Sequence, residues 1–352
     1  MQSRLKRVKN SMKAKGISAF LVSKPENQIY LTGFHSSNCQ LVLTEDTNYL
    51  LTDFRYIEAA GALAPLYHVV LTDANVTLYT FLKDIAIEEL AIEENILSHG
   101  EYKRLEENVG CRFLSGDGIV ETARIIKDDT ELQAIKKAQQ IADRGFSYML
   151  NYLKPGLTEL EAAFELEMFL RKEGAQALSF DTILVSGVRT SLPHGVPSEK
   201  KLEKGDFITM DFGCIVDGYC SDMTRTVALG KVSQEQKEVY NIVLEAQKNG
   251  CDAIRQGLSC RDADKACRDI ITDAGYGEFF GHGTGHGVGL EIHEAPTLNA
   301  RSDEVLEENM IVTIEPGIYL PKQFGVRIED LAIVTASGII NLVKSDKELI
   351  VV

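Results

Sequence analysis

The 352-residue sequence has no tryptophan, only eight prolines and only seven histidines. No apolar run approaches the roughly 18 residues that a membrane span requires, so we expect no transmembrane segment. The N-terminal segment MQSRLKRVKN is basic, but no apolar stretch of signal-peptide length follows it, and we expect no secretion signal. The seven cysteines are scattered and lack CxxC spacing, which favours reduced thiols in a cytoplasmic protein over a disulfide framework.

Positive charge is also scarce. The sequence has 37 Lys and Arg against 52 Asp and Glu, which gives a net charge of −15. Such a surface repels phosphate groups and anionic lipids, so we expect neither nucleic acid nor membrane among its partners. Hydrophobic residues make up 44% and charged residues 25%, which indicates a folded globular protein. The length predicts about two domains.

Residues 1–124 show a pattern of alternating short strands and helices. A helix at 4–15 and a strand at 18–23 precede an expected hairpin over 40–53. Helices are predicted near 54–63, 76–91 and 101–108, and strands near 67–72, 94–98 and 112–115. This alternation predicts an α/β domain that ends near residue 124.

Residues 125–352 show a different pattern, in which pairs of helices are followed by strands. Asp128, Asp129 or Thr130 could cap a long helix that runs to about residue 152. Thr158 and Glu161 form a capping-box pattern for the next helix. Strands are predicted at 180–186, 206–213, 219–228, 310–315 and 326–334, and two further helices at 233–255 and 260–274. The repeated order suggests a duplicated α+β half.

Four of the seven histidines lie in patterned segments. His194 occurs in SLPHGVPS, and three others occur within GHGTGHGVGLEIHEAP: His282, His286 and His293. Glycines allow close backbone approach and leave the neighbouring side chains accessible. A single histidine is usually structural, but three within twelve residues of a glycine-rich segment indicate a functional site.

The segment 208–226 predicts a hairpin that turns at Asp217-Gly218. Asp211 and Asp222 are almost symmetric about this turn, so we expect the two carboxylates to face each other across adjacent strands. Two unpaired carboxylates at short range repel, and a cation between them would remove that repulsion. The alternative is that Asp222 pairs with Arg225 while Asp211 caps a turn.

Two further acidic residues follow in strand-like segments. Glu315 ends an apolar strand in TIEPGIY, and Arg327 and Glu329 are two residues apart, hence on one strand face. Four carboxylates and one imidazole suit divalent ions such as Mn²⁺ better than structural Zn²⁺, and their four negative charges match two divalent cations. These candidate ligands are Asp211, Asp222, His286, Glu315 and Glu329.

The motifs D-x10-D, HGTGHGVGLEIHE, TIEPGIY and GVRIED, in this order, resemble the metallopeptidase family of aminopeptidase P, prolidase and methionine aminopeptidase. This family has the pita-bread fold. The first domain, with TDFRY at 52–56, is similar to the one that precedes the catalytic domain in prolidases, aminopeptidases P and creatinases. The resemblance therefore implies a creatinase-like N-terminal α/β domain over 1–124 and an α+β pita-bread catalytic domain over 125–352.

The resemblance also implies a ligand set for two divalent ions, most often Mn²⁺ in this family, with Co²⁺ or Zn²⁺ as alternatives. Asp211 would bind one metal, and His286 and Glu315 would bind the other. Asp222 and Glu329 would bridge both ions.

Roles for the remaining site residues follow from the same resemblance. Glu315 would shuttle a proton, and His293 would polarise the scissile carbonyl group. His282 would lie beside the pocket for the P1′ proline, with His194 on the opposite wall. Arg327 would orient the carboxylate of a metal ligand.

The implied activity is hydrolysis of the Xaa-Pro bond at the N-terminus of dipeptides or short peptides, by attack of a metal-bridging hydroxide. Phe180 stands where aminopeptidases P often have Tyr, which is a small indication of a dipeptidase, and both the dipeptidase and the aminopeptidase remain candidates. Methionine aminopeptidases generally lack the first domain, and creatinases lack the metal ligands. A non-catalytic peptide-binding protein of the same fold is the alternative, although such relatives have typically lost ligand residues. The family also implies a homodimer.

Overall fold

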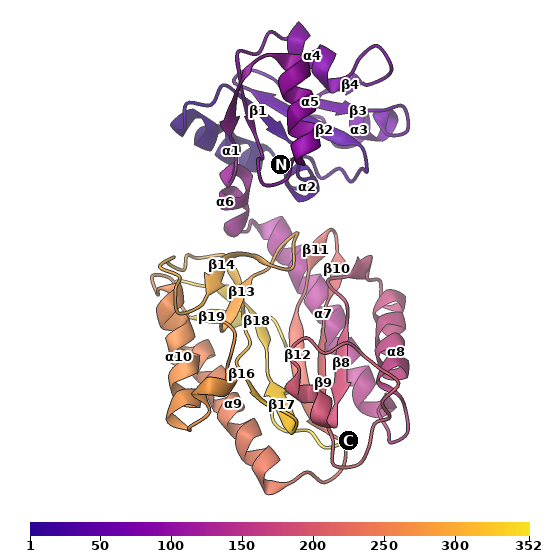
Figure 1. The fold of residues 1–352 in the computed structure, drawn as a ribbon, viewed down its shortest axis with the longest axis vertical. Coiled ribbons are helices and arrows are strands. Elements are labelled where there is room, and N and C mark those ends of the chain that lie inside the picture. The colour runs from indigo at the N-terminus through magenta and orange to yellow at the C-terminus, as the bar shows by residue number, and fades with distance from the viewer. The chain divides into compact units, whose positions relative to one another are not determined.

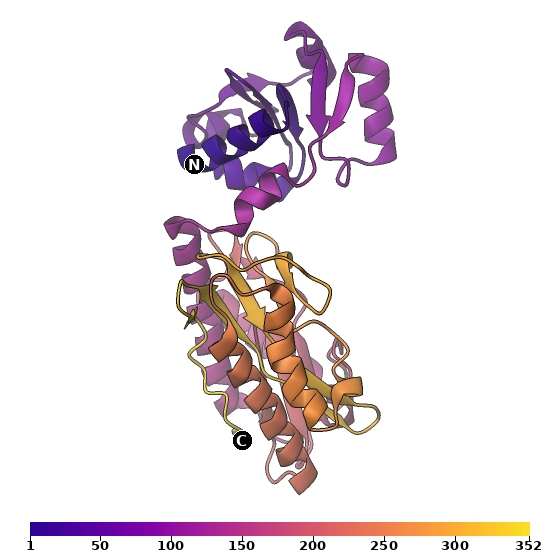
Figure 2. The ribbon, with the colours of Figure 1, turned by 90° about the vertical axis from the view of Figure 1, so that its left-hand side faces the viewer.

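The structure is a computed structural model that describes residues 1–352, and it divides into two compact units, Met1–Arg124 and Ile125–Val352. In each unit, helices pack against β-sheet (Figures 1 and 2). None of the helices combines the length and the apolar character that a membrane crossing requires. All seven cysteines are free thiols.

The first unit is built on a six-stranded sheet with the strand order β4-β3-β2-β1-β5-β6. The strands are β1 (Ala19–Val22), β2 (Cys39–Thr44), β3 (Asn48–Thr52), β4 (His68–Leu71), β5 (Glu89–Ile92) and β6 (Arg112–Ser115). The helices are α1 (Gln2–Ala14), α2 (Pro25–Thr32), α3 (Ile57–Leu63), α4 (Leu78–Asp84), α5 (His99–Val109) and α6 (Ile119–Ile125). Alternate strand residues such as Leu21, Val42 and Leu51 form its apolar core.

Two predictions in this unit are wrong. The helix expected over 76–91 ends at Asp84, and the chain then turns through Ala86, which has a φ of 51°. The strand expected near 94–98 instead lies earlier, as β5, which pairs in parallel with both β1 and β6. Leu90 is fully buried in this position. Pairing with strands distant in sequence therefore decides the structure of this apolar stretch.

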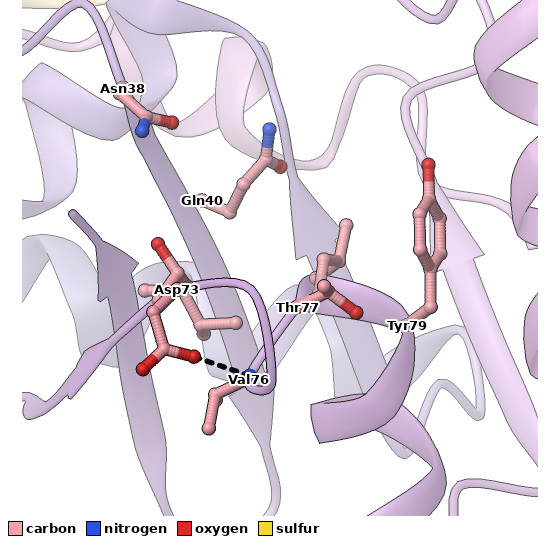
Figure 3. Close-up of a pocket in the computed structure, with 9 residues that line it drawn as sticks. Asn38, Gln40, Asp73, Val76, Thr77 and Tyr79 are labelled. Carbon is pink, nitrogen blue, oxygen red and sulfur yellow. Dashed lines mark hydrogen bonds between the residues drawn. The ribbon is translucent and has the colours of Figure 1, made fainter.

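A pocket of about 350 Å³ opens on the first unit (Figure 3). The Asp73 carboxylate accepts a hydrogen bond of 2.8 Å from the Val76 amide in the loop beside it. The lining residues are Asn38, Gln40, Leu51, Thr72, Asp73, Val76, Thr77, Leu78 and Tyr79. None of the predicted site residues lines this pocket.

The second unit has two pairs of long helices that flank the strands (Figure 1). Asp128 is the N-cap of the first helix, and Thr158 with Glu161 forms the capping box of the second, as predicted. These helices are α7 (Asp129–Tyr152), α8 (Glu159–Lys172), α9 (Gln234–Ala253) and α10 (Cys260–Asp273). Short 3-10 helices span Gly187–Ser191 and Gly277–Phe279.

The strands of the second unit form four small sheets, with the orders β11-β10-β7, β12-β9-β8, β14-β13-β15-β18-β19 and β16-β17. Their bounds are β7 (Ala177–Leu178), β8 (Ile183–Ser186), β9 (Phe207–Phe212), β10 (Cys214–Val216), β11 (Tyr219–Cys220), β12 (Met223–Ala228), β13 (Gly285–Gly287), β14 (Glu294–Leu298), β15 (Ile311–Ile314), β16 (Gly317–Leu320), β17 (Phe324–Arg327), β18 (Asp330–Val334) and β19 (Ile339–Asn341). The single strands expected over 219–228 and 326–334 are therefore each interrupted.

Candidate metal centre and active site

Two of the five predicted ligands lie in strands of the second unit, and the other three lie directly beside a strand end. Asp211 lies in β9 and His286 in β13, whereas Asp222 precedes β12, Glu315 follows β15 and Glu329 lies between β17 and β18. Nε2 of His286 is 3.6 Å from an Asp222 oxygen and 3.4 Å from a Glu315 oxygen. Ligand atoms of Asp222, His286 and Glu329 all lie within 4.8 Å of one another.

The cluster contains more negative than positive charge. Burial, and then the charges of Asp211 and Glu315, raise the pKa of Asp222. Burial and the charge of Asp222 likewise raise the pKa of Glu329. Burial raises the pKa of Glu315 to about 8, although the Arg327 guanidinium opposes this shift. Buried carboxylates need compensation, and one guanidinium does not neutralise four of them.

His286 presents a neutral nitrogen to the carboxylates. Its Nδ1 is 3.0 Å from the carbonyl oxygen of Gly287, which can only accept, so Nδ1 carries the proton and Nε2 keeps its lone pair. Burial lowers the pKa of His286 to about 4, so the ring is neutral at pH 7. The register between β13 and β14 shifts at His286 and Gly287, and a β-bulge of this kind re-aims a side chain.

Two buried oxygens in the cluster have no hydrogen-bond donor. They are Oδ1 of Asp211 and Oδ1 of Asp222. An unsatisfied buried acceptor costs about 1–3 kcal/mol, and more when it is charged. Carboxylate oxygens with one imidazole nitrogen are donors that suit ions such as Mn²⁺. The residues present therefore fit divalent cations.

Arg327 and a threonine that the sequence analysis missed hold two of the carboxylates in place. Arg327 Nη2 donates to Asp211 Oδ2 at 2.6 Å, and Arg327 Nε donates to the Thr224 hydroxyl at 3.0 Å. Thr224 in turn donates to Glu329 Oε2 at 2.7 Å. The available signal was the position of Thr224, two residues after Asp222 and hence on the same strand face.

The structure rejects the alternative pairing and corrects the expected register. Arg225 Nη2 pairs with Asp330 Oδ1 at 2.8 Å rather than with Asp222, and Asp211 lies within β9 rather than at a turn. The hairpin is present, but Asp211 is opposite Thr224. The expectation that Asp211 and Asp222 lie directly opposite each other is therefore wrong by two residues. Their carboxylates are diagonal neighbours.

The remaining predicted histidines differ in exposure. His282 is half-buried, and desolvation lowers its pKa to about 4. His194 is exposed, and its charge contributes to the same lowering of the His282 pKa. His293 is also exposed, and the centre of its ring is 4.4 Å from that of His286. His282 Nε2 is 2.8 Å from the Tyr319 hydroxyl, which accepts a hydrogen bond from Arg327.

Comparison with known families matches both units. Residues 133–336 match Metallopeptidase family M24, and residues 4–126 match the Creatinase/Prolidase N-terminal domain. The chain belongs to metallopeptidase family M24. This membership confirms the expected resemblance and the enzyme class, a metallopeptidase, for this M24 protein.

Solved structures and curated relatives are similar to this M24 peptidase over its full length. The Xaa-Pro dipeptidase from Bacillus anthracis is 45% identical, with a TM-score of 0.97, over 100% of this chain and 99% of that one. An X-Pro aminopeptidase from Thermotoga maritima is 38% identical, with a TM-score of 0.90, over 99% of both chains. A Xaa-Pro dipeptidase from Pyrococcus horikoshii is 36% identical over 99% of both sequences. The predicted fold class, a creatinase-like domain followed by a pita-bread catalytic domain, is confirmed.

Proposed function

We propose that this M24 peptidase hydrolyses Xaa-Pro bonds at the N-terminus of dipeptides or short peptides. We further propose that two divalent cations are held by Asp211, Asp222, His286, Glu315 and Glu329, the set expected from the sequence. The observation that carries this proposal is the pair of donorless buried carboxylate oxygens beside a neutral imidazole. Relatives named Xaa-Pro dipeptidase and X-Pro aminopeptidase support the substrate class.

The residues around the cluster would divide the work of hydrolysis. When bound, the cations would supply Lewis acidity and an activated water. Glu315 would accept a proton at its carboxylate and return it during bond cleavage. His293, exposed beside His286, would donate to the carbonyl oxygen as negative charge develops there. Arg327 would keep the Asp211 carboxylate oriented.

Proline imposes two requirements on such a site. The Xaa-Pro nitrogen has no hydrogen, so it must be protonated as it leaves. The pyrrolidine ring also needs a shaped apolar slot. We propose that His282 and His194 form the walls of this slot, because His194 is close enough to contribute to the lowered pKa of His282.

The test is a peptide assay on Mn²⁺-loaded protein. An Xaa-Pro dipeptide should be cleaved, and an Xaa-Ala dipeptide should not. His286→Ala and Glu315→Ala should abolish cleavage while the far-UV circular dichroism spectrum stays unchanged. His99→Ala, which removes an exposed histidine of the first unit, serves as the matched control and should keep full activity. Undiminished cleavage by either site variant would refute the assignment.

Substrate length separates the two activities within this class. We propose the dipeptidase, supported by Phe180 and by the 45% identical Xaa-Pro dipeptidase from Bacillus anthracis. An Xaa-Pro-Xaa tripeptide in the same assay decides between them. Cleavage of the tripeptide at a rate equal to that of the dipeptide would identify an aminopeptidase instead.

Four further properties belong to the same proposal. We propose that Mn²⁺ is the physiological ion, that the protein is a cytoplasmic homodimer, and that its thiols are reduced. Metal content after purification, measured by mass spectrometry, should be close to two ions per chain. Light scattering after size exclusion measures the oligomeric state. A protein that binds Xaa-Pro peptides without retaining metal would be a peptide-binding module rather than a peptidase.

A further inference from the structure

One face of α10 carries a partly buried ion pair that the proposed chemistry does not use. Arg268 Nε donates to Asp264 Oδ2 at 2.7 Å, and Arg268 Nη2 donates to Asp264 Oδ1 at 2.9 Å. The pair is therefore bidentate, with the two residues four apart on one helix face. Asp264 is 1% exposed, so its charge depends on these donors.

The other donors of the guanidinium go to the segment that presents His282. Arg268 Nη1 donates to the carbonyl oxygen of Phe280 at 2.9 Å, and Nη2 donates to that of His282 at 2.7 Å. The guanidinium carbon also lies 4.2 Å from the centre of the Phe280 ring. Arg268 therefore fixes the backbone on the N-terminal side of His282 and at His282 itself.

Asp264 fixes the backbone on the C-terminal side of the same histidine. Both the amide and the hydroxyl of Thr284 donate to Asp264 Oδ1 at 3.0 Å. The carbonyl oxygen of Thr284 accepts from the Glu315 amide at 2.8 Å. The ion pair therefore holds both flanks of His282, and its contacts continue to the backbone of a candidate metal ligand.

The orientation of the His282 ring depends directly on this backbone. Its Nδ1 is 2.8 Å from the carbonyl oxygen of Gly283, so Nδ1 carries the proton. Nε2 then accepts from the Tyr319 hydroxyl. Because one ring nitrogen is bound to the adjacent peptide group, a shift of segment 280–284 would move the ring away from Tyr319.

We propose that Arg268, held by Asp264, is a positioning residue that sets the His282 imidazole in the substrate pocket. The role in the pocket rests on the proposed function, whereas the positioning of segment 280–284 does not. The planar guanidinium group of Arg268 donates to two carbonyl oxygens and one carboxylate at once. The ammonium group of lysine cannot reproduce that geometry. Arg268→Lys therefore keeps the charge and removes the positioning.

Hydrogen exchange measured by mass spectrometry tests the positioning without any substrate. Arg268→Lys should increase exchange in a peptide covering 280–284, where the Thr284 amide is a direct reporter. Lys265→Met is the matched control, because Lys265 forms an i,i+4 pair with Asp269 on the same helix but both side chains are more than half exposed. The control should leave exchange in 280–284 unchanged. Equal exchange in Arg268→Lys and wild type would overturn the proposal.

Kinetics with the Mn²⁺-loaded full chain test the consequence for the pocket. Arg268→Lys should lower kcat/KM for an Xaa-Pro dipeptide about 10- to 100-fold, as loss of a supporting contact typically does. In a His282→Ala background the same substitution should change kcat/KM by less than about twofold. A full loss in both backgrounds would indicate a merely structural role and would overturn the proposal.

A replacement variant and a comparison of the exchange and kinetic results keep the outcomes separable. If Arg268→Lys fails to give the wild-type circular dichroism spectrum, Asp264→Asn replaces it, because the amide keeps the Thr284 contact and weakens the ion pair. The same exchange and kinetic criteria then apply to that variant. If wild type cleaves no Xaa-Pro peptide while exchange rises in Arg268→Lys, the proposed function fails and the positioning of 280–284 stands.

Discussion

Removal of metal should make the stability of the protein fall as the pH rises. In the metal-free fold, burial raises the pKa of Glu315 from 4.5 to about 8. The folded state therefore holds a proton that the unfolded state releases above pH 4.5. By linkage, this contribution to stability is complete below pH 4.5 and is lost as the pH rises through about 8. With cations bound, the carboxylates stay ionised in the fold and the loss should disappear.

The loss of stability that Glu315 causes in the metal-free protein is best measured between pH 6.5 and 8. His286 and His282 work in the opposite direction, because burial lowers the pKa of each from 6.5 to about 4 in the fold, and their effect fades as the pH rises above 6.5. Glu315 alone gives a slope that falls from about 1.4 kcal/mol per pH unit at pH 6.5 to about half of that at pH 8, or about 1.5–2 kcal/mol in total. For a unit of this size, about 2 kcal/mol corresponds to a Tm decrease of roughly 4–8 °C. The raised pKa values of Asp222 and Glu329 have the same sign.

Scanning calorimetry of chelator-treated and Mn²⁺-reloaded protein at pH 6.5 and pH 8 measures this difference. The Tm gap between the two forms should widen at pH 8. Glu315→Gln, a neutral isostere, should show a smaller widening because it removes one of the titrating groups. A gap that is constant or that narrows as the pH rises would show that the buried carboxylates of the metal-free cluster do not hold protons near neutral pH.

Further predictions concern the residues that support the site. Arg327→Lys should weaken Mn²⁺ binding about 10- to 100-fold in equilibrium dialysis, because a single ammonium cannot hold Asp211 with the same geometry; unchanged affinity would contradict this. Lys127→Met should lower the free energy of unfolding by about 3–5 kcal/mol in urea titrations, because it leaves the Glu294 carboxylate buried without this partner. Lys137→Met, which breaks an exposed ion pair, should lower the free energy of unfolding by at most about 1 kcal/mol. An equal loss of stability in the two variants would refute the distinction between the buried and the exposed pair.

The sequence was sufficient to predict the hairpin that carries two of the ligands. The turn was predictable because an Asp-Gly pair favours the positive φ values that Asp217 and Gly218 both adopt. This turn also sets the register, because all residue pairs of the hairpin, including Asp211 with Thr224, are symmetric about it. The close backbone approach at Gly213, where an added Cβ would lie 1.9 Å from the Ser221 carbonyl oxygen, is a tertiary feature without a local pattern.

The supporting residues were harder to predict than the ligands. Asp264 and Arg268 lie in the charged helix sequence CRDADKACRD, where they look like solvent-facing residues. Only the packing of α10 shows that Asp264 is buried whereas Lys265 is exposed. Motif spacing identifies metal ligands because metal binding requires particular residue types. A contact to a backbone carbonyl group needs only a hydrogen-bond donor nearby, and several residue types can supply one.

Three of the four acidic ligands lie at strand interruptions, and this position has a physical reason. A carboxylate in the middle of a paired strand is surrounded by neighbours that already use their hydrogen bonds, so its second oxygen has few donors. At Glu329 the chain leaves the sheet of β16 and β17 and joins that of β15 and β18, and at Asp222 it leaves β11 before joining β12. These changes of sheet bring acidic groups from separate sheets to one place. The interruptions therefore create the concentration of negative charge that divalent cations would stabilise.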